Sequence, residues 1–169
     1  KRAIRYLKQF QPKQVMDMAT GTGDFAFEAL ALNPQKVTAV DLSEGMLSYG
    51  RKKSDRRKTT DNIDWVKGDA ENLDYPDGFF DAITVGFGVR NFENLEAGLK
   101  GMSRVLAPNG KLVILEISKP RRFPFSALFH VYFHYVCPII GRLFSKDHRA
   151  YTYLPESVAA FPHGDQLVD

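Results

Sequence analysis

The sequence predicts a doubly wound α/β domain with a parallel sheet, and three observations support this fold class. Short apolar segments rich in Val and Ile alternate with helical segments along the chain, an order that right-handed crossovers turn into a parallel sheet. Gly, Pro, Asp or Asn bounds each apolar segment. The 169 residues, 44% hydrophobic and 25% charged, also suffice for one core of useful size.

Turn-forming residues mark the expected strands. Pro12 precedes the first strand and Pro34 the second. Gly68 follows the third, Gly78 precedes the fourth, and a Pro-Asn-Gly turn at 108–110 precedes the fifth. On this basis we expect strands at residues 14–18, 36–41, 63–67, 80–86 and 111–117.

Helical segments fill the intervals between the strands. We expect them at residues 23–32, 44–54 and 92–106. The last has the clearest pattern, because Leu95, Leu99 and Met102 fall on one face. Asn91 stands where it would cap the start of this helix.

Residues 123–141 break the alternation, because they carry no Asp, Glu, Lys or Arg. The length of this run alone would suggest a membrane span. Pro124, Pro138, His130 and His134 argue against a span. A buried or interfacial helical hairpin is therefore the better interpretation.

The charge and cysteine content narrow the class of protein. Lys plus Arg total 23 and Asp plus Glu total 20, so the net charge of +3 is too evenly mixed to indicate a nucleic-acid partner. The single Cys137 excludes a disulfide framework and a multi-cysteine zinc site, and we expect a cytoplasmic protein without a metal. The chain opens on Lys1-Arg2, so we expect no cleavable signal peptide. Its first residue is not Met, so we expect a piece of a longer protein.

The strongest local signal is a glycine-rich loop at residues 17–24, between the first strand and the first helix. Gly21 and Gly23 allow a sharp turn and a close approach of the backbone to a ligand. With Ala26 they also satisfy the relaxed dinucleotide pattern, which by itself is weak. Asp41 ends the second strand, where an acidic residue binds ribose hydroxyls; the alternative is a carboxylate that caps the next helix.

Acidic residues favour one class of nucleotide at this loop. Asp17 would repel the pyrophosphate of a dinucleotide. S-adenosylmethionine carries an ammonium and a sulfonium but no phosphate, and Asp17 and Asp24 suit those charges. The alternative is that Asp17 only hydrogen-bonds loop amides. Asp69 and Ala70, after the third strand, are placed to face adenine, although alone they would indicate an ordinary turn.

At this point the sequence resembles a known family. The segments that carry the resemblance are MDMATGTGD, VDLSEGML, KGDAENL, ITVGFGVRNF, RVLAPNGKLVILEISKP and YTYLPESVAAFP. Together they resemble the class I S-adenosylmethionine-dependent methyltransferases and, more narrowly, the ubiquinone/menaquinone biosynthesis C-methyltransferases. The glycine loop identifies only the superfamily, whereas FGVRN and LEISKP are specific to the quinone branch.

The resemblance implies a Rossmann-like core at residues 1–120 that lacks the last two strands, and an apolar helical substrate or lid region at 121–169. It implies S-adenosyl-L-methionine as cofactor. The cofactor residues that it implies are Gly21, Thr22 and Gly23 at the methionine moiety, Asp41 at the ribose, Met46 against adenine, and Asp69 and Ala70 beside the base. Gly86 stands where the family often has Ser, so this chain lacks a hydroxyl at that point.

The resemblance further implies methyl transfer to a ring carbon of a prenylated hydroquinone. Arg90 and Asn91 are the residues expected to contact the quinol oxygens. The alternative for Arg90 is an ion pair with Glu93 or Glu96. His130 and His134 are placed to act as bases or as packed polar residues, and two tyrosines at 151 and 153 are placed in a lid.

Partners and rival functions follow from the same resemblance. The apolar run suits a prenyl tail or peripheral contact with the inner face of the cytoplasmic membrane, and a homodimer is compatible with the sequence. The rivals are a methyltransferase for another small acceptor and a non-catalytic binding subunit of a quinone-synthesis assembly. An NAD-dependent oxidoreductase is the most distant alternative, because Asp17 opposes it.

Overall fold

A computed structural model describes residues 2–117, 120 and 122–136, without the side chains at 130, 133 and 134. The chain divides into two compact units, Lys1–Glu116 and Ile117–Asp169, and each is described by itself. The expectations for His130, His134, Cys137, Tyr151 and Tyr153 fall on side chains that lie outside this description.

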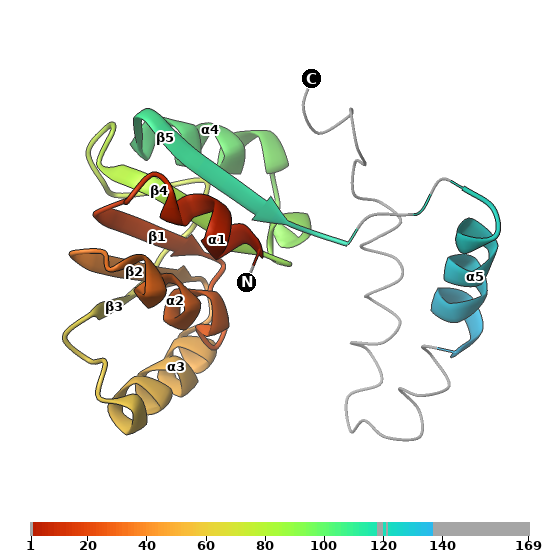
Figure 1. The fold of residues 1–169 in the computed structure, drawn as a ribbon, viewed down its shortest axis with the longest axis horizontal. Coiled ribbons are helices and arrows are strands. Elements are labelled where there is room, and N and C mark those ends of the chain that lie inside the picture. The colour runs from red at the N-terminus through yellow and green to blue at the C-terminus, as the bar shows by residue number, and fades with distance from the viewer. Residues whose placement is uncertain (1, 118–119, 121, 137–169) are drawn as a thin grey trace. The chain divides into compact units, whose positions relative to one another are not determined.

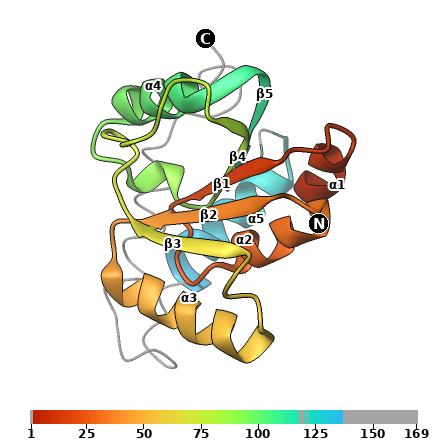
Figure 2. The ribbon, with the colours of Figure 1, turned by 90° about the vertical axis from the view of Figure 1, so that its left-hand side faces the viewer.

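The first unit is built on a five-stranded parallel sheet in the order β3-β2-β1-β4-β5 (Figures 1 and 2). The strands are β1 (Gln14–Met18), β2 (Lys36–Asp41), β3 (Ile63–Lys67), β4 (Phe80–Gly86) and β5 (Leu106–Leu115). The strand order reverses between β1 and β4, and ligands bind at such a switch point, beyond the carboxyl ends of the strands. The predicted fold class is confirmed.

Four strands have the predicted bounds, but β5 differs. It begins at Leu106 instead of residue 111, because Leu106 pairs with Phe80 before the register shifts. It ends at Leu115, whose partner is Gly86, the last residue of β4. The two strands therefore end side by side, which places the residues that follow them at the same edge.

The helices of the first unit are α1 (Arg2–Lys8), α2 (Asp24–Ala29), α3 (Glu44–Arg57) and α4 (Leu95–Val105), with short 3₁₀ turns at Leu30–Leu32 and Val89–Asn91. Helix α4 begins later than expected, and its N-cap is Asn94, whose side chain accepts from the Ala97 amide at 3.0 Å. Asn91 does not cap it, because this residue ends the 3₁₀ turn η2 (Val89–Asn91). Asn91 is thereby left at the carboxyl edge of the sheet.

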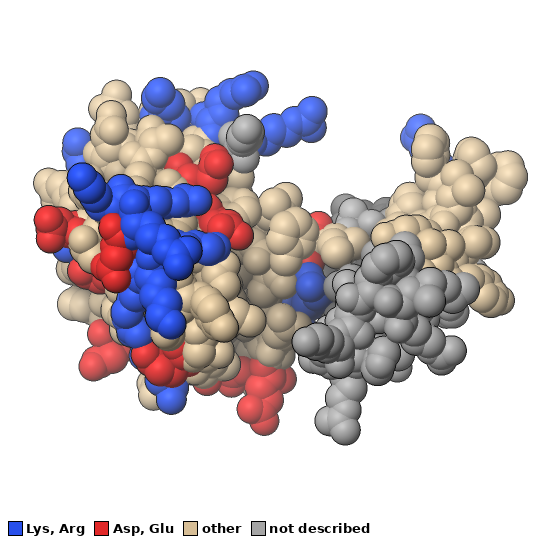
Figure 3. Space-filling view, turned by 90° about the horizontal axis from the view of Figure 1, so that it is seen from below, with Lys and Arg blue, Asp and Glu red and all other residues tan. Residues whose placement is uncertain are grey.

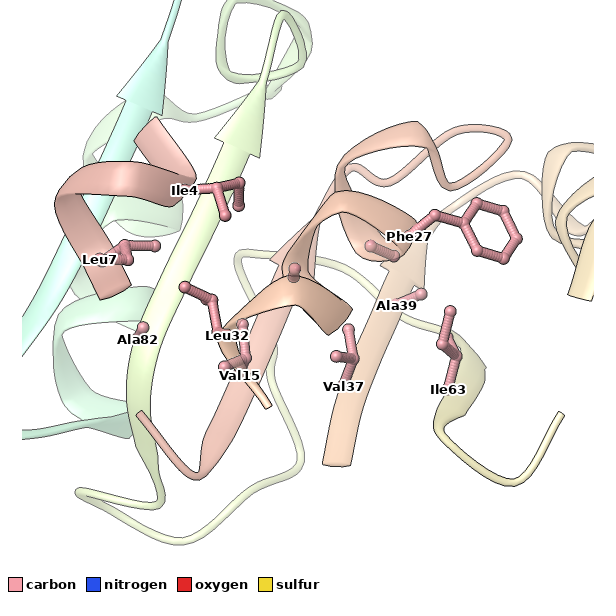
Figure 4. Packing of buried hydrophobic residues seen from close by; sticks show 11 residues of the cluster. Ile4, Leu7, Val15, Phe27, Leu32, Val37, Ala39, Ile63 and Ala82 are labelled. Carbon is pink, nitrogen blue, oxygen red and sulfur yellow. The ribbon is translucent and has the colours of Figure 1, made fainter. Parts of the chain in front are cut away.

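A hydrophobic cluster on one face of the sheet fixes the positions of the strands (Figure 4). Ile4 and Leu7 bring α1 onto this cluster, Val15 contributes from the central strand β1, and Val37 contributes from its neighbour β2. Burial of such side chains stabilises the fold by roughly 1.5–3 kcal/mol each. The core thus holds the strand ends that carry the candidate site.

The described part of the second unit is helical, with α5 (Phe125–Val131) followed by a π-helical turn (Tyr132–Val136). Its aromatic and aliphatic side chains are largely exposed, Phe125, Leu128 and Tyr135 among them. No helix among the described residues is both long enough and apolar enough to cross a membrane.

Candidate functional site

A cavity of about 500 Å³ lies at the carboxyl edge of the sheet in the first unit. The predicted site residues that line it are Gly21, Asp41, Met46, Asp69, Ala70, Gly86 and Asn91. The predicted residues outside its lining are Asp17, Thr22, Gly23 and Arg90. The cavity is therefore formed by the loops after β1, β2, β3 and β4, as expected for a doubly wound sheet.

The turn of the glycine loop depends on Gly23. This residue is the N-cap of α2 and has φ of 85°, in the left-handed region that favours glycine. A Cβ here would also lie 2.2 Å from Cη2 of Trp65. Gly21 has φ of 57° but open space around it, so only its conformation favours glycine.

The amides of this loop are bound to protein acceptors. The Thr20 amide donates to the Val40 carbonyl at 2.9 Å, and the Gly23 amide donates to the Thr20 carbonyl at 2.9 Å. The Gly21 amide donates to Oδ2 of Asp41 at 2.7 Å. These donors therefore do not form the open anion-binding nest that a pyrophosphate requires.

Asp41 occupies the end of β2 and faces the cavity. Its Oδ1 accepts from the Ser43 amide at 2.8 Å, so both of its oxygens are oriented by backbone donors. A carboxylate offers about four lone pairs, which leaves acceptor capacity for two hydroxyls. The capping alternative does not hold, because the N-cap of α3 is Ser43, whose Oγ accepts from the Met46 amide at 3.3 Å.

Asp17 is buried beneath the loop, with only 1% of its surface exposed. Its Oδ2 accepts from Oγ1 of Thr20 at 2.5 Å, and its Oδ1 accepts from Oγ1 of Thr84 at 2.7 Å. Burial raises the pKa of Asp17 to about 6, although the two hydroxyl donors oppose this shift. In the structure Asp17 joins β1, the loop and β4, and its expected contact with a cofactor ammonium stays a prediction.

Lys53 of α3 holds the other side of the loop. Its Nζ donates to Oγ1 of Thr22 at 2.8 Å, to the Thr22 carbonyl at 3.2 Å and to Oδ1 of Asp24 at 2.9 Å. Asp24 is exposed and outside the cavity lining, and its ion pair with Lys53 helps to hold the loop; its expected role toward the cofactor stays a prediction. Sequence patterns gave no signal for Lys53, which lies in a basic run.

Charge on the surface of the first unit is mixed, and Figure 3 shows a band of Lys and Arg side chains bordered by Asp and Glu. Part of the basic charge of α3 is paired, because Arg51 forms an ion pair with Glu44 and Lys53 forms one with Asp24.

The charge of the cavity differs from that of the surface. Its charged lining residues are all acidic: Asp41, Asp69, Glu71 and Glu93, with no Lys or Arg among the described residues that line it. Such a cavity favours a cationic ligand over a phosphorylated one.

Arg90 forms an ion pair with Glu116, which directly follows β5. The expected alternative partners are wrong: Glu96 pairs with Lys100, and Glu93 lines the cavity. Only 11% of the Arg90 side chain and 6% of the Glu116 side chain are exposed. No sequence pattern assigned a role to Glu116, although this residue lies in the LEISKP segment and at a strand end, where site residues gather.

The absence of a side chain at Gly86 has a packing reason. A Cβ at this position would lie 2.8 Å from Cδ2 of Phe25. The ring of Phe25 therefore occupies the space that a serine would need. Phe87, next along the chain, has φ of 60° and is half exposed at the cavity.

Comparisons with known proteins agree on a family. The profile described as "ubiE/COQ5 methyltransferase family" matches residues 1–169. A relative from Bacteroides fragilis named demethylmenaquinone methyltransferase is 48% identical over 168 residues, which cover 99% of this chain and 69% of that protein. A relative from Geotalea daltonii named ubiquinone/menaquinone biosynthesis C-methyltransferase UbiE is 43% identical over 167 residues, 98% of this chain and 71% of that protein.

Solved structures give the same fold. A SAM-dependent methyltransferase from Aquifex aeolicus superposes with a TM-score of 0.61 at 25% identity, over 74% of this chain and 70% of that one. A putative S-adenosyl-L-methionine-dependent methyltransferase from Methanococcus maripaludis has a TM-score of 0.66 at 18% identity, over 98% of this chain and 80% of that one. The second likeness bears on the fold alone.

Proposed function

The chain belongs to the ubiE/COQ5 methyltransferase family, and from this premise we propose that it transfers a methyl group from S-adenosylmethionine to a ring carbon of a prenylated quinol. Relatives named for menaquinone and ubiquinone biosynthesis cover nearly its whole length. The family therefore places the chain among the C-methyltransferases of quinone biosynthesis. A demethylmenaquinol is the acceptor that we favour, because the more similar of the two relatives described above carries the name demethylmenaquinone methyltransferase.

The acidic lining of the cavity is the observation that supports this cofactor most directly. S-adenosylmethionine supplies an electrophilic methyl group on a sulfonium and also carries an ammonium, so carboxylates attract it. Asp41, held by two backbone amides, is oriented to accept from the ribose hydroxyls. Met46 and Ala70 supply apolar surface for adenine, and Asp69 lies beside Ala70. A nicotinamide dinucleotide would instead place its pyrophosphate among carboxylates.

The reaction is a substitution at carbon. Loss of a proton from a ring hydroxyl places electron density on the neighbouring ring carbon. That carbon forms a bond to the methyl group as the bond from sulfur to the methyl breaks, and the same ring carbon then loses its proton. Alignment of the two reactants supplies much of the rate. Preorganised charge that stabilises the phenolate supplies another part.

Arg90 and Asn91 are the residues that we propose act on the quinol oxygens. Asn91 lines the cavity, so its side chain is placed to hydrogen-bond a ring oxygen. Arg90 lies beside it in η2 and carries the positive charge that a phenolate requires. Thr22 and Gly23 act on the methionine moiety through the shape of the loop, since neither lines the cavity.

The second unit offers apolar surface for the rest of the substrate. Phe125, Leu128 and Tyr135 of its helical segment expose large hydrophobic side chains. We propose that residues 121–169 receive the prenyl tail or rest at the membrane surface, where such tails are dissolved. Sedimentation of the protein with liposomes, with and without a long-tailed quinol, tests this part separately.

A transfer assay tests the proposed function. The protein is incubated with methyl-labelled S-adenosylmethionine and a chemically reduced, short-tailed demethylmenaquinol, and the quinol is analysed by mass spectrometry. We expect one labelled methyl group on the ring, and none when the acceptor is left oxidised, because the quinone lacks the nucleophilic carbon. Equal turnover of acceptors without a prenyl tail would indicate a different small-molecule substrate. Cofactor binding without any transfer would indicate a non-catalytic subunit.

A further inference from the structure

The ion pair between Arg90 and Glu116 joins the ends of two neighbouring strands. Gly86 and Leu115 are the last paired residues of β4 and β5, and the Phe87 amide donates to the Leu115 carbonyl at 2.8 Å. Arg90 follows β4 through a short turn, and Glu116 follows β5 directly. The carboxylate therefore lies directly after a paired strand, and the guanidinium lies in the turn beside the cavity.

Burial makes this pair different from the other ion pairs in the described part of the chain. The remaining pairs in the described residues join side chains that are at least one-third exposed, as for Lys36 and Asp64 or Lys100 and Glu96. Arg90 and Glu116 are both about nine-tenths buried. Both partners of a buried ion pair lose their hydration, so such a pair often contributes little net stability. We therefore consider how this pair positions the Arg90 side chain.

The guanidinium keeps hydrogen-bonding capacity beyond this pair. Glu116 accepts from Nη1 of Arg90, whereas Nε of Arg90 is buried without an acceptor among the described residues. A guanidinium has five N–H donors in a rigid plane, so anchoring Nη1 restricts the directions in which the other donors can point. Asn91, the next residue, lines the cavity.

We infer that Glu116 is a positioning residue for methyl transfer: it holds the Arg90 guanidinium in the plane from which that group acts on the quinol oxygen. This inference rests on the function proposed above. The attraction between the Glu116 carboxylate and the Arg90 guanidinium also anchors Arg90 at the strand edge. Arg90 therefore does not turn toward Glu93 or Asp69, which are carboxylates of the cavity. Glu116 itself does not contact the reacting atoms in this account.

The test compares Glu116→Gln, Glu116→Asp and Glu116→Ala with wild type in the transfer assay. Glu96→Gln is the matched control, because Glu96 forms an exposed ion pair with Lys100 on α4. For each protein we would measure kcat, KM for the quinol, Kd for S-adenosylhomocysteine and the thermal unfolding midpoint. The titration with S-adenosylhomocysteine reports on the cofactor cavity alone.

We expect Glu116→Ala to lower kcat by about 100-fold, the size of effect that a misplacement near 1 Å produces. Glu116→Gln keeps an oxygen that accepts from Nη1 and Glu116→Asp keeps the charge, so each should lose less than alanine does. The Kd for S-adenosylhomocysteine should stay within about twofold of wild type, and Glu96→Gln should change nothing. Because glutamine has the same shape as glutamate, Glu116→Gln still tests the inference if Glu116→Ala does not fold.

Other outcomes would overturn the inference. A lower unfolding midpoint with unchanged kcat in Glu116→Gln would make the pair purely structural. A parallel loss of kcat and of S-adenosylhomocysteine binding would show a general collapse of the site. Wild-type protein that binds S-adenosylhomocysteine but methylates no quinol would instead refute the proposed function, and this result is distinct because it requires no variant.

Discussion

Gly23 and Gly50 contact the same tryptophan ring, so alanine at the two positions separates steric overlap from backbone strain. A Cβ at Gly23 would lie 2.2 Å from Cη2 of Trp65, and one at Gly50 would lie 2.1 Å from Cζ3 of the same ring. Only Gly23 has a positive φ, of 85°, whereas Gly50 is inside helix α3. The steric overlap with Trp65 is therefore similar at the two positions, and only the cost of the backbone conformation differs.

The expected magnitudes follow from these two terms. Forcing a side chain against the ring costs about 1–3 kcal/mol at either position. At Gly23 the left-handed backbone adds about 1–2 kcal/mol for any residue with a Cβ. At Gly50 alanine recovers about 0.5–1 kcal/mol of helix propensity. Gly23→Ala should thus lower the free energy of unfolding by roughly 1.5–3 kcal/mol more than Gly50→Ala does.

The same two substitutions in the Trp65→Leu variant remove the steric overlap and keep the cost of the backbone conformation. In Trp65→Leu the ring is absent, so Gly50→Ala should become neutral or stabilising by up to about 1 kcal/mol. Gly23→Ala should still cost about 1–2 kcal/mol there. Urea unfolding followed by far-ultraviolet circular dichroism measures all six proteins, and it does not depend on the tryptophan signal. Equal costs for the two alanines, or costs that Trp65→Leu leaves unchanged, would refute this account of the loop.

Three further predictions concern the carboxylates and the lysine that support the loop. Asp41→Asn should weaken S-adenosylhomocysteine binding by about 10–100-fold, the effect of losing charged hydrogen bonds to two hydroxyls, and calorimetry measures it; unchanged affinity would contradict the ribose role. Lys53→Met should weaken the same binding by a few fold, because the hydrogen bonds from this partly buried side chain to Thr22 and Asp24 contribute up to about 1 kcal/mol. Lys52→Met, at the neighbouring position, should leave the binding unchanged, and equal effects would contradict this role of Lys53. Asp17 has a folded pKa raised from 3.8 to about 6, so its contribution favours folding at low pH and is lost as pH rises through that interval. Urea unfolding at several pH values should show wild type losing about 2–2.5 kcal/mol relative to Asp17→Asn between pH 4 and pH 7; a pH-independent difference would contradict the buried position.

The fold could be predicted from the sequence where local signals decide it. Four strands have the predicted bounds, because turn-forming residues stand at their ends. The start of β5 could not be predicted, because Leu106 becomes part of a strand only through its pairing with Phe80, far away in sequence. Asn91 and Asn94 are equally good caps in local terms, and the fold selects Asn94.

The site was predictable in position and less so in contacts. Asp41, Met46 and Ala70 come together because the carboxyl ends of parallel strands meet at one edge. The direction of each side chain depends on partners that no short pattern contains. Asp17 is bound by Thr84, and Arg90 by Glu116, each through a neighbouring strand.

We expect the acidic cavity at the carboxyl edge of the sheet to bind S-adenosylmethionine and not a nicotinamide dinucleotide. The most direct test is a calorimetric titration of this protein with S-adenosylhomocysteine, with reduced nicotinamide dinucleotide in a parallel titration. We predict micromolar binding of S-adenosylhomocysteine with one site per chain, and no heat from the dinucleotide. Binding of the dinucleotide, or no binding of S-adenosylhomocysteine, would contradict the claim.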